Sequence, residues 1–374
     1  MKRILVLLLT VCLILSCLVG CKKNKPDDQI DNSANNTTQS SNSTTDTSES
    51  TTETTEETTE EEIFPYTHPL TGEPLKEPWS GKIVAVMTNN IEKSMPQHGM
   101  SEADIVFEME EEGSITRNMA LFSDVSKAGP IGSIRSARTY FVSVAEAFDA
   151  YLVHCGTSNH AAGGRYDQNG HKVKDWKDLD QFYNSKYFYR DQARLDKGYG
   201  WEHTLFTSGE KLNSALEGKA DSIPTGADGG FGMQFGNNID LNGDKAEDIT
   251  ITFKATRKTG FKYDAATKLY KRIQHGKDSI DGNTNSAVYF KNVIAIYTKQ
   301  WRCNCENSGH QFYNTIGEGD GYAAINGKIV PIKWSRKDVS SPYTYTLADG
   351  SPLILDVGTT YVAFAGIKHP IIYK

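Results

Sequence analysis

The stretch Lys82-Ile83-Val84-Ala85-Val86-Met87-Thr88 is a short apolar run with β-branched residues, which predicts a buried strand. Similar runs at residues 105–109, 118–122 and 151–154 predict three more strands in the same half of the chain. We therefore expect one sheet to organise the first half of the protein.

Two helices are expected beside these strands. Residues 140–148 place Phe141, Val144, Ala145 and Phe148 on one helical face. A second helix is expected near residues 209–216, where Ser208 is a suitable N-cap. Strands mixed with helices predict an N-terminal α/β domain with a mixed sheet at residues 63–232.

The pattern changes after Asp248 to alternating residues and turns. Strand candidates are residues 249–253, 292–297, 321–325, 328–332, 352–355 and 360–364. Asn326-Gly327 between two of them predicts a two-residue hairpin turn. The glycine-rich residues 226–238 interrupt any regular pattern, so we expect the domain boundary there. The sequence thus predicts an α+β protein whose second domain, residues 233–374, is mostly β.

The N-terminus has the organisation of a signal peptide at residues 1–20. Lys2 and Arg3 precede an apolar run that ends in Leu18-Val19-Gly20-Cys21. The run of about 15 apolar residues is shorter than a membrane span of roughly 20. Leu-Val-Gly-Cys matches the bacterial lipobox, in which the cysteine receives diacylglycerol and becomes the new N-terminus. We expect lipidation of Cys21 with fatty acids such as palmitate; the alternative is an ordinary secretory leader with a chance cysteine.

Residues 21–62 are rich in Ser, Thr, Asn, Asp and Glu and have almost no apolar side chains. Such a segment cannot bury enough surface to offset its chain entropy, so it is expected to be a disordered tether. A lipid on Cys21 and this tether predict a protein held at the extracytoplasmic face of the cell membrane, within reach of wall polymers or envelope proteins.

Several segments carry a resemblance to a known family. In the first half these are residues 67–73, 85–90, 101–108, 113–117 and 129–138. They closely resemble the YerB-like lipoproteins, a domain family of unknown function. Tyr270, Arg272, residues 292–294 and residues 317–334 look like the family's separate C-terminal domain. The resemblance covers nearly all of the folded chain and implies fold and location rather than an activity. One departure is Cys155, which follows His154 where we expect a small residue.

Composition excludes some functions. The chain has 47 Asp and Glu against 40 Lys and Arg, which does not favour nucleic-acid binding. After removal of the leader, Cys155, Cys303 and Cys305 remain beside the lipidated cysteine. This odd number cannot pair completely, and Cys303 and Cys305 are too close for an unstrained disulfide, so no disulfide framework is expected.

The strongest ligand-binding candidates are Arg117, Arg135 and Arg138. Arg135 and Arg138 follow a Gly-Pro-Ile-Gly turn and precede the first expected helix, so guanidiniums and helix N–H groups could converge on a phosphate or carboxylate. The alternative is a buried structural network in which the arginines pair with the nearby carboxylates Glu108, Glu110 and Glu112.

His154, Cys155, His160 and His203 form a second group of candidates. His154 and Cys155 end an expected strand, at the edge where open α/β sheets place ligand sites. Cys155 as a nucleophile with a histidine base, and a metal site of the three histidines, are both considered. No motif fixes these partners in space, so Cys155 as a small buried residue is preferred, catalytic residues are not assigned, and no metal or cofactor is predicted.

Three other patterns are discounted. Residues 240–248 begin like a calcium loop but have Lys245 at the turn position and lack the closing acid, so a surface loop is preferred. Cys303, Cys305 and His310 make an incomplete zinc site. Aromatic residues such as Trp176, Tyr183 and Trp201 suggest a sugar- or peptide-binding surface, although core packing is preferred.

Three functions remain open at this point. The first is a non-catalytic envelope protein that binds an anionic ligand or partner at an arginine-rich cleft formed by Arg117, Arg135 and Arg138, with Glu112, His154 and His203 nearby. The second is an envelope enzyme like the LytR-CpsA-Psr phosphotransferases, with Arg135 and Arg138 on the phosphates and Asp104 near a magnesium ion. The third is a scaffolding lipoprotein whose β domain docks a partner.

Overall fold

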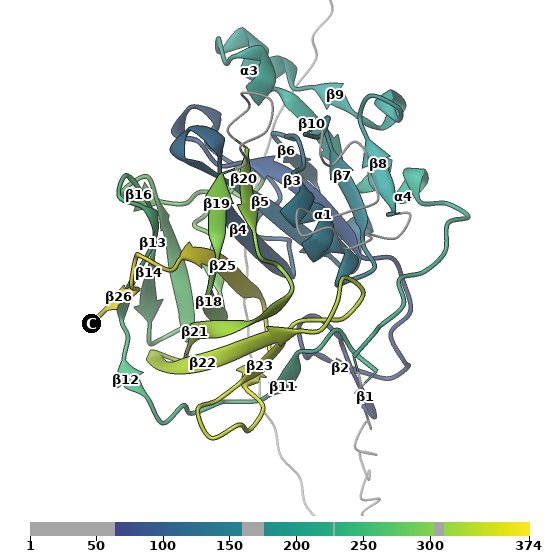
Figure 1. Cartoon of the computed structure of the whole chain (residues 1–374). Helices are drawn as coiled ribbons and strands as arrows, with labels where there is room; N and C mark the ends of the chain where they lie inside the picture. The colour runs from purple at the N-terminus through teal and green to yellow at the C-terminus, as the bar shows by residue number, and fades with distance from the viewer. Residues whose placement is uncertain (1–63, 159–175, 227–228, 303–309) are drawn as a thin grey trace, which may run out of the picture. The chain divides into compact units, whose positions relative to one another are not determined.

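Strands dominate the computed structural model, which describes residues 64–158, 176–226, 229–302 and 310–374 (Figure 1). The α-helices among these residues are short: α1 (Thr139–Glu146), α3 (Gln192–Asp196) and α4 (Gly209–Ala215). The prediction of an α+β protein with an α/β first domain is therefore wrong, and the protein is mostly β. Residues 61–374 form one unit by their internal contacts. No described helix is long and apolar enough to cross a membrane.

One large central sheet contains strands from both halves of the chain. In spatial order its strands are β12 (Asp244–Lys245), β22 (Lys328–Arg336), β21 (Gly317–Ile325), β18 (Asn292–Thr298), β25 (Thr360–Gly366), β4 (Ile105–Glu111), β5 (Ile115–Phe122), β3 (Val84–Asn89), β7 (Tyr151–His154) and β8 (Asp178–Asp180), and β23 (Thr344–Thr346) pairs with β22.

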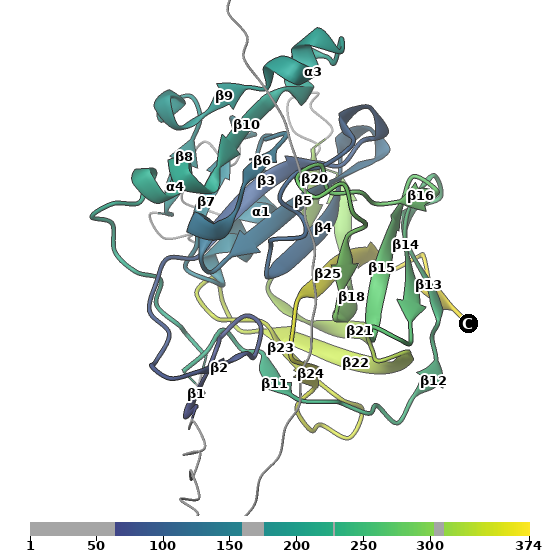
Figure 2. The ribbon, with the colours of Figure 1, turned by 180° about the vertical axis from the view of Figure 1, so that it is seen from behind.

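The two halves meet where β4 and β25 pair. These strands are parallel, and Ile105 lies opposite Thr360 in the register. Figures 1 and 2 show the blue β4 beside the yellow β25 from opposite sides. The sheet is thus continuous across the predicted boundary at residues 232 and 233, and that boundary stays a prediction.

Both faces of the sheet are buried at strands such as β3 and β4, and the side chains alternate between the two faces as period-two strands require. Ala85 and Met87 of β3 pack on the face that α1 covers. Val84 and Val86 pack on the opposite face, with α4 and a second sheet. Because that second sheet takes the place of the helices of an α/β protein, the fold class differs from the prediction.

The second sheet has the order β16 (Lys277–Asp278), β15 (Leu269–Gln274), β14 (Arg257–Asp264), β13 (Asp248–Lys254) and β26 (Ile372–Tyr373), and β17 (Tyr289–Phe290) pairs with β15. A small sheet joins β6 (Pro130–Gly132), β10 (Leu205–Ser208) and β9 (Tyr189–Arg190). The remaining described pairs are β1 (Tyr66–Thr67) with β2 (Pro74–Leu75), β11 (Gln234–Gly236) with β24 (Ile354–Asp356), and β19 (Gln300–Arg302) with β20 (Gln311–Tyr313).

The predictions of individual strands and turns agree with the structure better than the predicted fold class does. The expected strands at 82–88, 105–109, 118–122 and 151–154 correspond to β3, β4, β5 and β7. Ser208 caps α4, because its side chain accepts a hydrogen bond from the Lys211 N–H at 3.3 Å. The Asn326-Gly327 hairpin between β21 and β22 is confirmed, with φ values of 50° and 79° at the two turn residues.

Candidate functional site

The carboxyl ends of three parallel strands, β3, β7 and β8, lie together at one edge of the central sheet. The segment 133–138 crosses these ends through backbone hydrogen bonds. The Arg135 N–H donates to Met87 O at 3.0 Å, and its carbonyl accepts from the Cys155 N–H at 3.1 Å. Strand ends of this kind position loops for ligand binding, and here they bring Arg135 beside Cys155.

Arg117 and Arg138 lie in a buried cluster of ion pairs. Arg117 pairs with Glu111, and its Nη1 donates to Ser136 O at 2.6 Å. Arg138 makes a two-pronged contact with Glu112, with Nε 3.2 Å from Oε1 and Nη2 2.9 Å from Oε2. Its Nη2 also lies 3.0 Å from Glu111 Oε1. Two of the three candidate arginines thus already form ion pairs with carboxylates of the chain.

Electrostatics in this cluster follow from burial and pairing. Burial raises the pKa of Glu111 and lowers the pKa of Arg117 to about 10, and each charge partly offsets the burial of the other. Burial also opposes ionisation of Glu112, but the hydrogen bonds and charge of Arg138 outweigh it and lower the pKa of that carboxyl. Arg117 therefore keeps its charge at neutral pH inside a structural network.

Glu108 and Glu110 are not part of this cluster, although the sequence groups them with the arginines. Arg117 on β5 lies opposite Met109 on β4, so it shares a face with Glu111. Glu108 and Glu110 point to the other face, where Glu110 pairs with Lys254 at 2.9 Å. The alternation of side chains along β4 is the reason for the difference.

Arg135 stands apart from the other two arginines, because no carboxylate among the described residues pairs with it. Its Nη1 donates to Glu202 O at 3.4 Å, and its buried Nε has no hydrogen-bond partner among the described residues. Arg190 donates through Nη1 to Trp201 O at 2.7 Å and also has no carboxylate partner within the described chain. The two guanidiniums thus reach the carbonyls of consecutive residues, and neither forms an ion pair with a described carboxylate.

One exposed aromatic ring contacts Arg190, and a second lies over Gly156, next to the Cys155 N–H that donates to the Arg135 carbonyl. The Arg190 guanidinium stacks 4.1 Å from the ring centre of Trp201, whose side chain is 61% exposed. Phe182, at 70% exposure, lies over Gly156, where an added Cβ would be 3.2 Å from its ring and where φ is +74°. Trp201 is therefore on the surface, contrary to the preference for core packing. We call Arg135, Arg190, Phe182 and Trp201 the Arg135 surface.

His203 lies buried beside this surface. Its Nδ1 is 3.0 Å from Asn89 Nδ2, and its Nε2 is 3.5 Å from Glu202 Oε1. Because the Asn89 amide donates to Nδ1, the ring proton is assigned to Nε2. Burial lowers the pKa of His203, so the ring is neutral at pH 7. His203 supports the Arg135 surface without adding charge to it.

His154 is brought near Cys155 but takes a structural role. The ring is fully buried and stacks on Trp176 at 5.4 Å between ring centres. Its Nε2 lies 2.8 Å from Asp178 Oδ1, and its Nδ1 lies 3.0 Å from Gly156 O. Both nitrogens are therefore occupied, and neither is directed at the thiol of Cys155.

Chemistry at Cys155 has little support in this geometry. Burial raises the pKa of the Cys155 thiol, and its Sγ lies 3.5 Å from Gln181 Oε1. A reactive thiol needs the opposite shift. His160, Cys21, Cys303 and Cys305 lie outside the described residues. Within the described part, no three His, Cys, Asp or Glu side chains gather as a metal site.

The phosphotransferase arrangement is not assembled. Asp104 directly precedes β4, whose first residue, Ile105, pairs with Leu121 of β5. Arg135 is instead hydrogen-bonded to Met87, near the other end of β3. The Asp104 and Arg135 positions are thus separated by two strands across the sheet and by several residues along the strands. Each separation is about 10 Å. Asp104 therefore does not share a site with Arg135.

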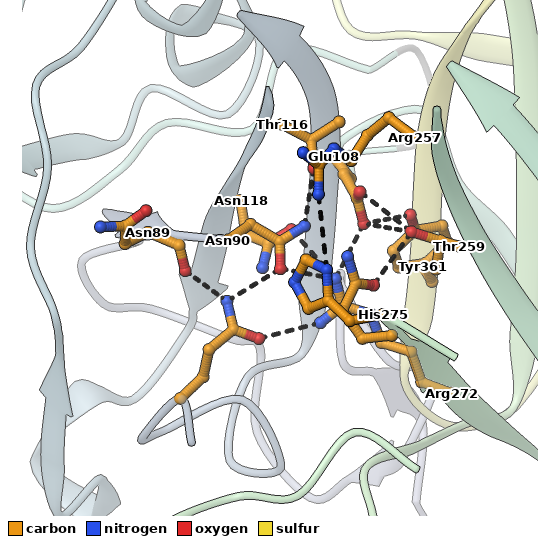
Figure 3. Close-up of polar contacts among 12 residues, drawn as sticks. Asn89, Asn90, Glu108, Thr116, Asn118, Arg257, Thr259, Arg272, His275 and Tyr361 are labelled. Carbon is orange, nitrogen blue, oxygen red and sulfur yellow. Dashed lines mark hydrogen bonds and ion pairs between the residues drawn. The ribbon is translucent and has the colours of Figure 1, made fainter. Parts of the chain in front are cut away.

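A buried polar network that the sequence did not indicate joins the two halves of the chain (Figure 3). Arg272 of β15 and Glu108 of β4 are fully buried, and their Nη2 and Oε2 atoms are 2.8 Å apart. Glu108 Oε2 also accepts from the Tyr361 hydroxyl at 2.7 Å. Arg272 Nη1 donates to Gln97 Oε1 at 3.1 Å. Because 164 residues separate Arg272 from Glu108 in the sequence, local pattern does not reveal the pair.

His275, at the rim of this network, gives a test of pH dependence. Burial lowers its pKa, so the unfolded chain binds the proton near pH 6.5 while the folded chain does not. Protonation of this residue therefore lowers the free energy of unfolding as the pH falls through this range. His275→Asn removes the titrating group and suits the local φ of 53°.

We expect the variant to lose less stability than the parent protein between pH 7.5 and pH 5.5. Urea denaturation at the two pH values measures the difference. Equal losses of unfolding free energy in the two proteins would contradict the role of His275 in the pH dependence.

Comparison with known proteins identifies related sequences. The model described as "Protein of unknown function (DUF3048) N-terminal domain" matches residues 70–222. The corresponding C-terminal domain model matches residues 249–362. The chain is also similar to "Putative lipoprotein YerB" of Bacillus subtilis (strain 168), with 26% identity over 298 residues. That match covers 71% of this chain and 83% of the relative.

A solved structure shares the fold. The crystal structure of the YerB protein from Bacillus subtilis matches with a TM-score of 0.65 and 24% identity. The match covers 82% of this chain and 99% of that chain. Both halves described above thus occur together in another protein.

Proposed function

This chain belongs to the DUF3048 family of proteins of unknown function, and we propose that it is a lipid-anchored extracytoplasmic protein that binds an anionic ligand at the Arg135 surface. Family membership agrees with the resemblance to the YerB-like lipoproteins. The family itself supplies no activity. The proposal therefore depends on the geometry of the chain.

The observation that carries the proposal is the pair of guanidiniums of Arg135 and Arg190. They converge on the carbonyls of Glu202 and Trp201, and none of the described carboxylates pairs with either. Arg117 and Arg138 show the alternative, because they already form ion pairs with Glu111 and Glu112. A bound phosphate or carboxylate would give Arg135 and Arg190 the counter-charge that the chain does not provide.

The exposed rings of Trp201 and Phe182 indicate the rest of the ligand. Aromatic side chains that are 61% and 70% exposed beside a charged group favour a ligand with a ring or an apolar portion next to its anionic group. A polymer or lipid carrying phosphates has this chemistry. A cell-envelope ligand of this kind would suit a protein held at the outer face of the membrane.

The anchor is proposed from Cys21, which lies outside the described residues. Its support is the lipobox at residues 18–21 and the word lipoprotein in the name of the similar Bacillus subtilis protein. Each buried methylene of an acyl chain contributes about 0.8 kcal/mol, so two chains hold the protein firmly. We expect mass spectrometry of the mature protein to find a diacylglyceryl group on an N-terminal Cys21. An unmodified N-terminus at any other residue would contradict the anchor.

Calorimetric titration of the purified protein with pyrophosphate and with a glycerol phosphate oligomer tests ligand binding. We expect saturable binding of at least one probe, weakened as salt rises from low ionic strength to about 0.5 M, because screening acts on charge pairs at a partly exposed site. Titration with a neutral glycerol oligomer is the matched control. Equal heats for charged and neutral probes, or no saturable binding, would overturn the proposal.

A further inference from the structure

A cavity separate from the Arg135 surface lies near the start of β3 and β4. Its volume is about 750 Å³, within the range of ligand pockets. Among the residues that line it are His68, Trp79 and Asp104. His68 belongs to the segment 67–73, and Asp104 immediately precedes β4. Segments far apart in the sequence therefore build this cavity.

The turn after His68 fixes the orientation of its ring. The Leu70 and Thr71 N–H groups donate to His68 Nδ1 at 3.3 and 3.2 Å, and the Thr71 hydroxyl lies 2.9 Å from the same atom. Nδ1 is thus an acceptor, and the ring proton is on Nε2. His68 is only 9% exposed, yet Nε2 has no acceptor among the described residues. At the wall of a cavity, such a ring N–H is available to an acceptor on a ligand.

Asp104 supplies acceptors to the same cavity. Its Oδ2 accepts from the Ser123 N–H at 2.6 Å, and the Ser123 side chain also stabilises the carboxylate, which leaves lone pairs for a further donor. Its backbone N–H and carbonyl are engaged with Leu121 and Thr360, which hold the residue in place. A donor at His68 and an acceptor at Asp104 thus line one cavity.

The charge around the cavity excludes anions and argues against a metal ion. Lys82 and Lys127 are engaged with Asp221 and Asp124 at 3.0 and 3.1 Å, so the carboxylates of the wall are in excess. A metal ion at His68 would need a lone pair on Nε2, which would move the proton to Nδ1 and break the contacts with Leu70 and Thr71. Burial also lowers the pKa of His68 and raises that of Asp104. These features disfavour an anion and a metal ion, and a neutral hydroxyl fits both the His68 donor and the Asp104 acceptor.

We infer that this cavity binds a neutral sugar, one hydroxyl of which accepts a hydrogen bond from His68 Nε2–H while a hydroxyl donates to Asp104. A hydroxyl is both donor and acceptor, so it satisfies the two groups without adding charge. Trp79, whose ring meets that of His68 edge-on at 6.4 Å, supplies an aromatic wall of the kind that sugars contact. This inference is independent of the Arg135 surface.

Calorimetry of the full mature protein with an N-acetylglucosamine trimer and with maltotriose tests the inference. Saturable binding of either sugar supports it. Tighter binding of the N-acetylglucosamine trimer would indicate a glycan of the wall type, and tighter binding of maltotriose would indicate a soluble glucan. His68→Asn keeps an acceptor for the Leu70 and Thr71 N–H groups but removes the Nε2 donor. We expect it to weaken binding at least tenfold, which corresponds to the loss of one hydrogen bond. Lys271→Ala on β15, which pairs with Asp278 and does not line the cavity, is the control and should leave sugar binding unchanged.

A measurement on the unaltered protein guards against a folding defect in the variant. Addition of the bound trimer should shift the nitrogen NMR signal of His68 Nε2 and leave that of the structural His154 in place. Absence of saturable binding for both sugars would overturn the inference. So would sugar binding that leaves the His68 signal unmoved, or His68→Asn that binds as tightly as the parent protein.

Discussion

Replacement of Glu108 by Ala is expected to lower the free energy of unfolding by about 3–5 kcal/mol, because it leaves the Arg272 guanidinium buried without its counter-charge. Both side chains are fully buried, and the contact between Nη2 and Oε2 is 2.8 Å. The substitution also removes the acceptor of the Tyr361 hydroxyl. The expected loss is a large fraction of the stability of an ordinary protein.

Urea denaturation of the purified protein measures this effect, and two variants serve as controls. Lys271→Ala removes the neighbouring residue of β15, whose exposed pair with Asp278 should contribute nothing measurable. The double variant Glu108→Leu with Arg272→Met removes both charges and should recover most of the loss. A Glu108→Ala protein within about 1 kcal/mol of the parent would show that the ion pair does not hold the two halves together.

Replacement of Arg135 by Gln is expected to weaken the binding of pyrophosphate at least tenfold. A hydrogen bond to a charged group contributes about 1.5–3 kcal/mol, and Arg135 has no carboxylate partner in the described chain to compete with the ligand. Gln keeps a donor for the Glu202 carbonyl, so the variant tests the charge rather than the local packing. Calorimetric titration at low ionic strength measures the change.

Arg138→Gln is the matched comparison, because Arg138 is three residues away and already paired with Glu112 at 2.9 Å. We expect it to change the affinity for pyrophosphate less than about threefold, through long-range charge alone. The expectation would be wrong if Arg138→Gln weakened binding as much as Arg135→Gln. In that event the ligand would bind at the whole arginine cluster.

The strands were predictable where local chemistry decides them. Val84, Val86 and their alternating neighbours in β3 are buried on both faces, which produces the continuous apolar run seen in the sequence. The fold class was not predictable in this way. Strands such as β9 at Tyr189–Arg190 are too short to show a period, and the pairing of β4 with β25 joins residues more than 250 positions apart.

The candidate site shows the same division between local and distant information. Arg135 could be selected because it follows a turn and precedes a helix. Its partner Arg190 carries no such mark, and only the small sheet of β6, β10 and β9 brings it near. Pairing of Arg117 with Glu111 depends on the register of β4 and β5, which the sequence does not specify.

Binding of an anion by Arg135 is tested most directly by nitrogen NMR of the arginine side-chain Nε–H groups during titration with pyrophosphate. The buried Nε of Arg135 has no hydrogen-bond partner in the described part of the chain, whereas Arg138 Nε already donates to Glu112. We expect the Arg135 signal to move to saturation with the ligand while the Arg138 signal stays in place. A saturable titration in which Arg135 remains unmoved, or one in which no signal moves, would contradict the proposed site.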